Sequence, residues 1–314
     1  MQLVAGLVLL FAGGESLVSG SVRFARAIGF PPLLIGLTLV AFGTSVPELA
    51  TSIDAAMAGS PGIAVGNVVG SNITNILLII GLVALISPIA CAPDTMRRDG
   101  SVMLMAALVC VLVLRYGQLT WWIGAAFLAG LLVYIGMAIR YTPHPPEGDT
   151  ISEQPLPDSA VKRHVLPLLT ALIGLMLVLV GASWLVNSAI SIAHALGVNE
   201  SIVGLTVVAA GTSMPELVTS LVAAIRRQAD IAIGNIIGSN IFNVLGILGA
   251  TAVVEPIPVP EQIRGFDGYF MCAVTLVFIA ASITGRRISR GEGAVFLLCY
   301  CAYLTLLSTH LQDQ

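Results

Sequence analysis

The chain has 314 residues, of which 57% are hydrophobic and 10% are charged, and its formal net charge is −3 at pH 7. A soluble globular domain carries roughly 25% charged residues, so the composition excludes that class and indicates an integral membrane protein. The small net charge and the absence of runs of like charge exclude nucleic acid as a partner. The partner that the composition does indicate is the lipid bilayer.

Ten segments are apolar and long enough for a helix to cross a bilayer, which takes about 20 residues. We therefore expect an all-α membrane protein with ten transmembrane helices, separated at charged residues and at clusters of proline and glycine. The predicted helices lie near residues 3–22, 32–58, 62–86, 101–116, 120–139, 165–188, 201–225, 230–254, 268–285 and 292–310.

Lysine and arginine are distributed unevenly over the loops between these segments. If the N-terminus faces outward, all but two of the 14 basic residues lie on the inner side, and only Arg115 and Arg264 lie outside. Short cytoplasmic loops of membrane proteins are enriched in basic residues. The distribution therefore predicts a multi-pass protein of the cell (inner or plasma) membrane with both termini on the outer side.

An internal repeat organises the chain. Residues 36–81 superimpose on residues 204–249 after a shift of 168, without a gap and with 27 identities in 46 positions. We therefore predict two five-helix repeats, residues 1–140 and 164–314, joined by a hydrophilic cytoplasmic linker at 141–163. Because five is odd, the second repeat starts from the opposite side of the membrane, so the repeats are inverted. This topology is typical of secondary transporters, whose substrate sites lie near the bilayer midplane at the repeat interface.

The motif Gly-Thr-Ser-x-Pro-Glu occurs once in each repeat, at residues 43–48 and 211–216. A glutamate inside a span is costly and indicates a functional site. Proline lacks a backbone N–H, clashes with the carbonyl four residues earlier, and disfavours helical geometry at the preceding residue, which is Val46 in the first motif. The break frees backbone carbonyls, which a bilayer tolerates only where they line a cavity or find partners. A hard cation prefers such carbonyls beside a carboxylate.

A second repeated motif, Gly-Asn-x-x-Gly-Ser-Asn-Ile-x-Asn at residues 66–75 and 234–243, adds oxygen atoms from the next span. Its serine and last asparagine are four residues apart, as are the threonine and glutamate of the first motif, so each pair shares a helix face. Its two glycines have the spacing of closely packed helices. An oxygen set without imidazole or thiolate favours Ca²⁺, Na⁺ or Mg²⁺ over zinc or copper. The candidate oxygen donors are Glu48, Glu216, Thr44, Thr212, Ser45, Ser213, Ser71, Ser239, Asn75 and Asn243.

Over these motifs the sequence resembles the cation/Ca²⁺ exchangers, a family that includes the sodium/calcium exchangers. The resemblance implies a membrane antiporter that exchanges Na⁺ for Ca²⁺ by alternating access, without a cofactor and without enzymatic activity. It implies Glu48 and Glu216 as acidic Ca²⁺ ligands, with backbone oxygens from Thr44 and Thr212. The Na⁺ sites that it implies involve Ser45, Ser71, Asn75, Ser213, Ser239 and the carbonyls of Ala41 and Ala209.

One position departs from part of that family. K⁺-dependent members and some prokaryotic relatives carry an aspartate where this sequence has Asn243, so the resemblance here is to K⁺-independent exchangers. The amide gives the pocket one negative charge fewer than an aspartate would. The departure leaves the number of bound Na⁺ ions open.

Two glutamates in one apolar site also suggest how exchange would arise. Uncompensated charge in a low-dielectric site costs several kcal/mol per ion, so an empty ionised pocket is not expected to close against both solutions. One Ca²⁺, two or more Na⁺ or two protons would each neutralise the glutamates. An H⁺-coupled antiporter of Ca²⁺ or another divalent cation is therefore the alternative, and a cation channel is the alternative from a different class. Glu15, outside the repeated motifs, is expected to pair with Arg23 or another loop cation.

Overall fold

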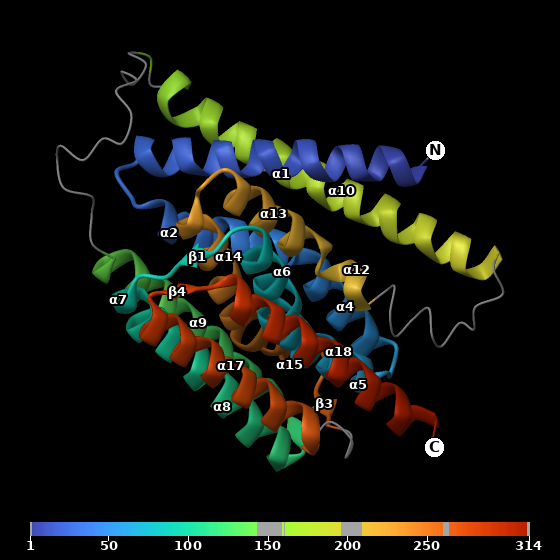
Figure 1. The fold of residues 1–314 in the computed structure, drawn as a ribbon. Helices are drawn as coiled ribbons and strands as arrows, with labels where there is room; N and C mark the ends of the chain where they lie inside the picture. Colours follow the sequence, from blue (N-terminus) through green and yellow to red (C-terminus); the bar gives the residue numbers. More distant parts are fainter. Residues whose placement is uncertain (1, 143–158, 160, 196–208, 260–263, 313–314) are drawn as a thin grey trace.

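The computed structural model of the chain describes residues 2–142, 159, 161–195, 209–259 and 264–312 (Figure 1). In this part of the chain the first repeat region contains α1 (Gln2–Ala27), α2 (Pro32–Ile35), η1 (Gly36–Val40), α3 (Ala41–Thr44), α4 (Val46–Met57), α5 (Pro61–Thr74), η2 (Asn75–Ile80), α6 (Gly81–Ile86), β1 (Ile89–Ala90), α7 (Pro93–Thr95), η3 (Met96–Gly100), α8 (Ser101–Tyr116), β2 (Gln118–Leu119) and α9 (Trp121–Tyr141). The second contains η4 (Val161–Val165), α10 (Leu166–Ala195), α12 (Ala209–Thr212), α13 (Met214–Ile225), α14 (Ala229–Ile241), η6 (Phe242–Leu248), α15 (Gly249–Val254), β3 (Ile257–Pro258), α17 (Phe266–Gly285), β4 (Arg287–Ile288) and α18 (Arg290–Gln312). The η segments are π-helical turns.

Within the described residues, eight continuous helical segments are long and apolar enough to cross a membrane. A ninth, from Pro32 to Met57, is bent by 43° between α3 and α4. Nine predicted segments coincide with these helices, whereas the segment at 201–225 is described only from Ala209 onward. Most of the predicted linker at 141–163 lies outside the described residues.

The fourth segment begins at Pro93, well before the predicted start at residue 101, and so includes charged residues. Arg98 Nη2 lies 2.7 Å from Asp99 Oδ2, and the Asp99 side chain is fully buried. The hydroxyl of Tyr134 in α9 donates to Asp99 Oδ1 at 3.5 Å. Because the two charges compensate each other, the helix continues through residues at which the sequence pattern predicted a boundary.

We expect the substitution Asp99→Asn to lower the free energy of unfolding by about 3 kcal/mol, because it leaves a partly buried guanidinium without its counter-charge. Thermal unfolding of the purified protein in detergent measures the change. Asp94→Asn is the matched control, since Asp94 pairs with Arg97 at 3.8 Å in an almost fully exposed position and is expected to produce no measurable change. Equal melting temperatures for the two variants would show that the Arg98–Asp99 pair contributes nothing.

Two short antiparallel pairings connect the two halves of the chain. β1 pairs with β4, with Ile89 opposite Ile288, and β2 pairs with β3, with Leu119 opposite Ile257. Each pairing therefore joins a strand of the first half to a strand of the second. In Figure 1 the β1–β4 pair and β3 lie at opposite ends of the helix bundle, and both chain termini lie at the same end.

Helices α1 and α10 cross in close contact on one side of the bundle (Figure 1). A Cβ added to Gly13 would lie 2.8 Å from the carbonyl of Gly174, and one added to Gly181 would lie 2.8 Å from the carbonyl of Gly6. Gly6 and Gly174 are 168 residues apart, as are Gly13 and Gly181. The two helices therefore pack through equivalent glycines, because only residues without a side chain allow this approach.

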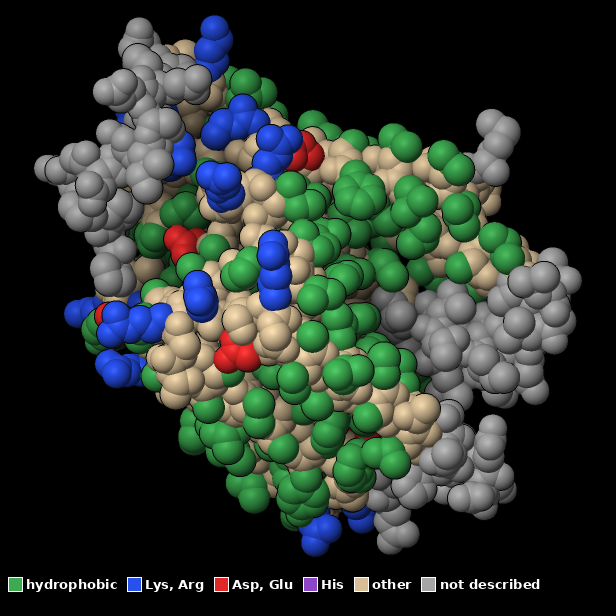
Figure 2. Space-filling view, in the orientation of Figure 1, with side chains coloured by type: hydrophobic (Ala, Val, Ile, Leu, Met, Phe, Trp, Pro, Cys, Tyr) green, Lys and Arg blue, Asp and Glu red, His purple; other side chains and the backbone are tan. Residues whose placement is uncertain are grey.

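The described surface is predominantly hydrophobic. Figure 2 shows lysine and arginine side chains gathered mainly over the end of the molecule that carries α2, β1 and β4, with a smaller group at the opposite end. Hydrophobic side chains cover the surface between these ends in this view (Figure 2), and Leu112, Leu132 and Leu298 are each about 70% exposed. An apolar surface between polar ends is what a protein embedded in a bilayer requires.

Candidate cation site

The two acidic motifs produce the same helix break. α3 ends before Ser45, which has φ −87° and ψ 9°, and α12 ends before Ser213, which has φ −86° and ψ 7°. Pro47 is the second residue of α4, so Val46 is helical and the prediction that Val46 leaves helical geometry is wrong. Proline fits this position because the first N–H groups of a helix have no partner within the helix.

Glu48 and Glu216 lie in the first turns of α4 and α13, and each is 1% exposed. The positive end of a helix dipole stabilises a carboxylate there. Ser45 Oγ donates to Glu216 Oε1 at 2.7 Å, and Ser213 Oγ donates to Glu48 Oε1 at 3.3 Å. Each serine at a break thus contacts the glutamate of the other half, and these crossed bonds bring the four residues into one buried cluster.

Two asparagines from the second motif donate hydrogen bonds to the helices that carry the glutamates. Asn67 Nδ2 donates to the backbone carbonyl of Glu48 at 3.0 Å, and Asn235 Nδ2 donates to that of Glu216 at 3.4 Å. Each asparagine also donates to a serine one turn beyond its glutamate, which is Ser52 or Ser220. The sequence analysis assigned these four residues no role, although all are identical in the repeat, and that identity could have identified them.

The carbonyl of Ala41 is the predicted backbone ligand for which the structure gives contacts. It accepts hydrogen bonds from Ser239 Oγ at 3.5 Å, Thr44 Oγ1 at 3.4 Å and the Ser45 amide at 3.2 Å. Thr44 Oγ1 also lies 3.2 Å from Asn235 Oδ1 and donates to it. These contacts bring Ala41, Thr44 and Ser239 together with the crossed serine and glutamate cluster.

Four acceptor oxygens of the predicted site are buried without a hydrogen-bond partner. They are Glu48 Oε2, Glu216 Oε2, Asn75 Oδ1 and Asn243 Oδ1. Buried polar groups normally find partners, and these atoms can accept hydrogen bonds but not donate them. A hard cation coordinates carboxylate and amide oxygens of this kind. Asn75 and Asn243 lie at the starts of the π-helical segments η2 and η6, which often occur at functional sites.

The remaining predicted residues are placed less directly. Ser71 is buried in α5, four residues before Asn75, and Thr212 is half-buried at the end of α12. Ala209 begins α12, but its side chain lies outside the described part. Among the described residues no three His, Cys, Asp or Glu side chains form a cluster, so the candidate site has two carboxylates and otherwise neutral oxygens.

The predicted glycine packing is seen in the second motif. A Cβ on Gly238 would clash with the carbonyl of Leu37, and one on Gly234 would lie 2.7 Å from the carbonyl of Leu33. A Cβ on Gly70 would meet no described atom within 4 Å. By the repeat, the segment corresponding to Leu33–Leu37 is 201–205, which lies outside the described residues.

Glu15 is separate from this site. Its carboxylate accepts a hydrogen bond from Arg226 Nε at 2.7 Å and lies 2.7 Å from Arg226 Nη2. Both side chains are about half exposed. The prediction that Glu15 pairs with a loop cation is therefore confirmed, with Arg226 as the partner.

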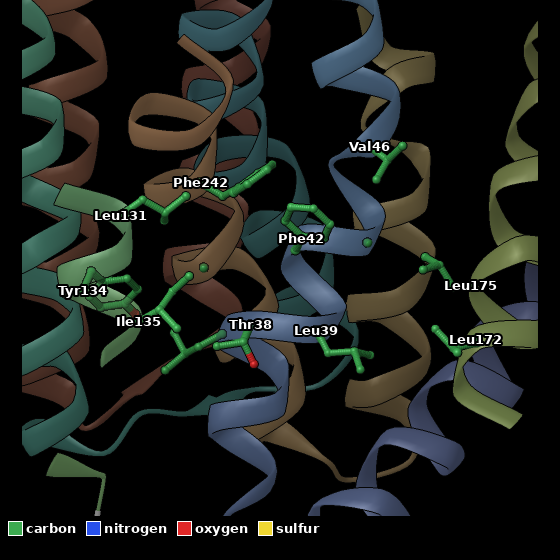
Figure 3. Close-up of a pocket in the computed structure, with 13 residues that line it drawn as sticks. Thr38, Leu39, Phe42, Val46, Leu131, Tyr134, Ile135, Leu172, Leu175 and Phe242 are labelled. Carbon is green, nitrogen blue, oxygen red and sulfur yellow. The ribbon is translucent and has the colours of Figure 1, made fainter. Parts of the chain in front are cut away.

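A cavity of about 480 Å³ lies beside the site; side chains of η1 and α3 line its middle, with those of α9 to one side and those of α10 to the other (Figure 3). Its labelled lining side chains are almost all apolar, among them Phe42, Leu131, Leu172 and Phe242. None of the four unpartnered oxygens belongs to this lining. The cavity is therefore distinct from the candidate cation site.

The chain matches the family model described as sodium/calcium exchanger protein over residues 1–140 and 166–309. It is 39% identical over 312 residues to CaxA of Alkalimonas amylolytica, a candidate antiporter, with 97% of each chain covered. It is 32% identical over 340 residues to the sodium/calcium exchanger MaX1 of Methanosarcina acetivorans, again with 97% of each chain covered. Its fold is similar to a solved structure of the sodium-calcium exchanger NCX_Mj soaked with Na⁺ and Sr²⁺, with a TM-score of 0.84, 32% identity, and 97% of this chain and 96% of that chain covered.

Proposed function

Because the chain belongs to the sodium/calcium exchanger family, we propose that it exchanges Na⁺ for Ca²⁺ across the cell membrane at one site built on Glu48 and Glu216. It is a multi-pass membrane transporter and not an enzyme; its transported ions are Ca²⁺ and Na⁺, and it uses no cofactor. One observation carries the assignment of the site. Each buried glutamate accepts a hydrogen bond from the serine at the helix break of the other half, and each keeps one carboxylate oxygen without a hydrogen-bond partner.

The charge of the site explains how binding would become exchange. With both glutamates ionised and no cation bound, closing the site would leave two negative charges uncompensated in an apolar protein within the membrane, at a cost of several kcal/mol per ion. One Ca²⁺ or at least two Na⁺ ions remove this cost. Release of one kind of ion must then be followed by loading of a competing ion before the site turns to the other side. This requirement is alternating-access antiport.

The neutral oxygens favour Na⁺ over protons as the competing ion. The amide oxygens of Asn75 and Asn243 cannot hold a proton at ordinary pH, but they can coordinate Na⁺ together with the hydroxyls of Ser45 and Ser213. An H⁺-coupled antiporter would use the neutral oxygens only for Ca²⁺, because its protons would be carried by the two glutamates, whereas a Na⁺-coupled one would use them for both ions. The extent of the buried oxygen set therefore supports Na⁺ coupling.

The proposed architecture is ten transmembrane helices in two inverted repeats, 1–140 and 164–314, with the linker and most basic loops in the cytoplasm. The strand pairings support it. A shift of 168 carries β1 onto β3 and Leu119 of β2 onto Arg287 of β4, so the β1–β4 and β2–β3 pairings are equivalent under the repeat. Their location at opposite ends of the bundle is expected when one repeat is inverted with respect to the other (Figure 1). Both chain termini lie at the end of the bundle that we assign to the cell exterior (Figure 1).

The proposal is tested by ⁴⁵Ca²⁺ uptake into proteoliposomes that contain the purified chain. We expect uptake when the vesicles are loaded with Na⁺ and diluted into Na⁺-free buffer, and no uptake without the Na⁺ gradient. Addition of K⁺ on either side should leave the rate unchanged, because Asn243 supplies no third carboxylate.

Two other results would point to the alternatives. Uptake driven by a pH gradient but not by a Na⁺ gradient would identify an H⁺-coupled antiporter. Ca²⁺ flux without any countertransported ion, measured as passive conductance, would identify a channel. Either result would overturn Na⁺/Ca²⁺ exchange for this chain.

A further inference from the structure

Asn72 links the two halves of the site without being one of its predicted ligands. It lies in α5, is 2% exposed, and accepts a hydrogen bond at 3.0 Å through its Oδ1 from Asn243 Nδ2 in η6. We propose that Asn72 is a positioning residue, which holds the Asn243 amide with its oxygen toward the transported cation. The proposal rests on the proposed function, and it adds a residue that determines the geometry of the site.

The Asn243 side chain needs such a partner because an amide has two chemically opposite ends. Its oxygen attracts a cation, whereas its NH₂ group repels one, and the terminal torsion of asparagine is only weakly restricted. Asn243 is 1% exposed, and its Oδ1 has no hydrogen-bond partner. Ser239, one helical turn earlier on the same face, reaches the carbonyl of Ala41. Fixing the NH₂ group of Asn243 therefore leaves the oxygen free on the face that lines the site.

The orientation of Asn72 is itself fixed from the other side. Its Nδ2 lies 3.4 Å from the backbone carbonyl of Asn240 and 3.5 Å from Met271 Sδ, and donates to both. A reversed Asn72 amide would place oxygen against the Asn240 carbonyl and NH₂ against the NH₂ of Asn243. Both contacts would be repulsive. The backbone carbonyl of Asn240 in α14 therefore fixes the orientation of the Asn72 amide, and Asn72 in turn fixes that of the Asn243 amide.

The other repeat does not contain the equivalent bond. The counterparts of Asn72 and Asn243 are Asn240 and Asn75. Asn240 Nδ2 donates at 2.7 Å to the carbonyl of Ile236 in its own helix, and Asn240 Oδ1 has no partner, so it accepts nothing from Asn75. Asn72 therefore acts on one side of the site only, and its repeat counterpart provides a matched control.

The test compares Asn72→Leu with Asn240→Leu in Na⁺-dependent ⁴⁵Ca²⁺ uptake. We expect Asn72→Leu to raise the apparent KM for Ca²⁺ at least tenfold, because Asn243 can then turn its NH₂ group toward the ion. Asn240→Leu should change KM less than threefold. Equal effects of the two substitutions, or no effect of Asn72→Leu on KM, would overturn the proposal.

A double variant separates positioning from packing of α5 against η6. If Asn72 acts through Asn243, then Asn72→Leu should produce no further increase in KM when Asn243→Ala is already present. If Asn72 is only a packing residue, its effect should be the same in both backgrounds. Full additivity of the two substitutions would therefore contradict the proposed role.

Asn72→Ala keeps the test decisive if the leucine variant does not fold. Alanine removes both ends of the amide without adding volume or charge, so KM for Ca²⁺ should again rise at least tenfold, against less than threefold for Asn240→Ala; a rise below threefold for Asn72→Ala would refute the positioning role. Uptake by the parent chain tests the proposed function separately. If the parent shows no Na⁺-dependent Ca²⁺ flux, the function fails, whereas the ratio between variant and parent tests Asn72.

Discussion

Vesicles containing Glu216→Gln are expected to lose Na⁺-dependent Ca²⁺ uptake by about a hundredfold or more. With one glutamate removed, bound Ca²⁺ leaves an uncompensated positive charge in the closed site, which costs several kcal/mol, and each 1.4 kcal/mol corresponds to a factor of ten. Glu48→Gln should have the same effect, because the crossed contacts Ser45–Glu216 and Ser213–Glu48 make the two glutamates equivalent. Initial rates of ⁴⁵Ca²⁺ uptake measure the loss.

The folded state should not suffer from either substitution. The empty site has two buried carboxylates near each other with no cation between them, so replacing one by an amide removes a destabilising charge. We expect thermal unfolding of Glu216→Gln, measured in detergent without Ca²⁺, at the parent temperature or above it. Glu15→Gln is the matched control, since this glutamate pairs with Arg226 outside the site and should retain transport. Normal uptake by Glu216→Gln, or loss of uptake by Glu15→Gln alone, would contradict the assignment.

Asn243→Asp is expected to reduce Ca²⁺/Ca²⁺ exchange at alkaline pH by at least about tenfold. The substitution adds a third carboxylate, and one Ca²⁺ then leaves a negative charge in the closing site, which costs several kcal/mol when buried. It also removes the NH₂ group that donates to Asn72. Protonation at acid pH removes the added charge, so exchange should recover there, whereas the parent rate should change much less.

Isotope exchange across a pH series, with equal unlabelled Ca²⁺ on both sides, measures this effect. The parent chain, assayed at the same pH values, is the control for any general effect of pH. A variant that exchanges Ca²⁺ at the parent rate throughout the series would show that the charge at residue 243 does not limit closure. In that case the two-glutamate charge balance would not be the basis of the mechanism.

The repeated motifs contain enough information to predict which residues of the candidate site lie together. Two glutamates that must each lie within a membrane span, at equivalent positions of a duplicated sequence, are expected to share a site because isolated charges in a bilayer are unfavourable. The structure places Glu48 and Glu216 together, with Ser45, Ser213, Thr44, Ser239 and the Ala41 carbonyl around them. Most span boundaries follow from hydropathy, because charged residues are unfavourable inside the bilayer.

Contacts between the halves could not be predicted in this way. The crossed serine and glutamate bonds depend on how α3–α4 and α12–α13 approach each other, and a one-dimensional pattern does not contain that geometry. The bonds from Asn67 and Asn235 to the glutamate carbonyls form within each half, and the identity of these asparagines in the repeat could have identified them. The helix break was misplaced at Val46 because the rule for residues before proline was applied to a helix interior, whereas α4 begins anew at this residue. The early start at Pro93 was missed because Arg98 and Asp99 were counted as separate charges and not as a pair.

Equilibrium binding of ⁴⁵Ca²⁺ to the purified chain, titrated at increasing Na⁺, tests most directly whether the two ions share one site. A shared site predicts one Ca²⁺ per chain at saturation, and an apparent Kd for Ca²⁺ that continues to rise with Na⁺ concentration while the capacity stays constant. The slope should exceed one on logarithmic axes, because at least two Na⁺ ions are needed to replace one Ca²⁺. A Kd that reaches a plateau at high Na⁺ would mean that both ions can be bound at once at separate sites, and it would contradict the account.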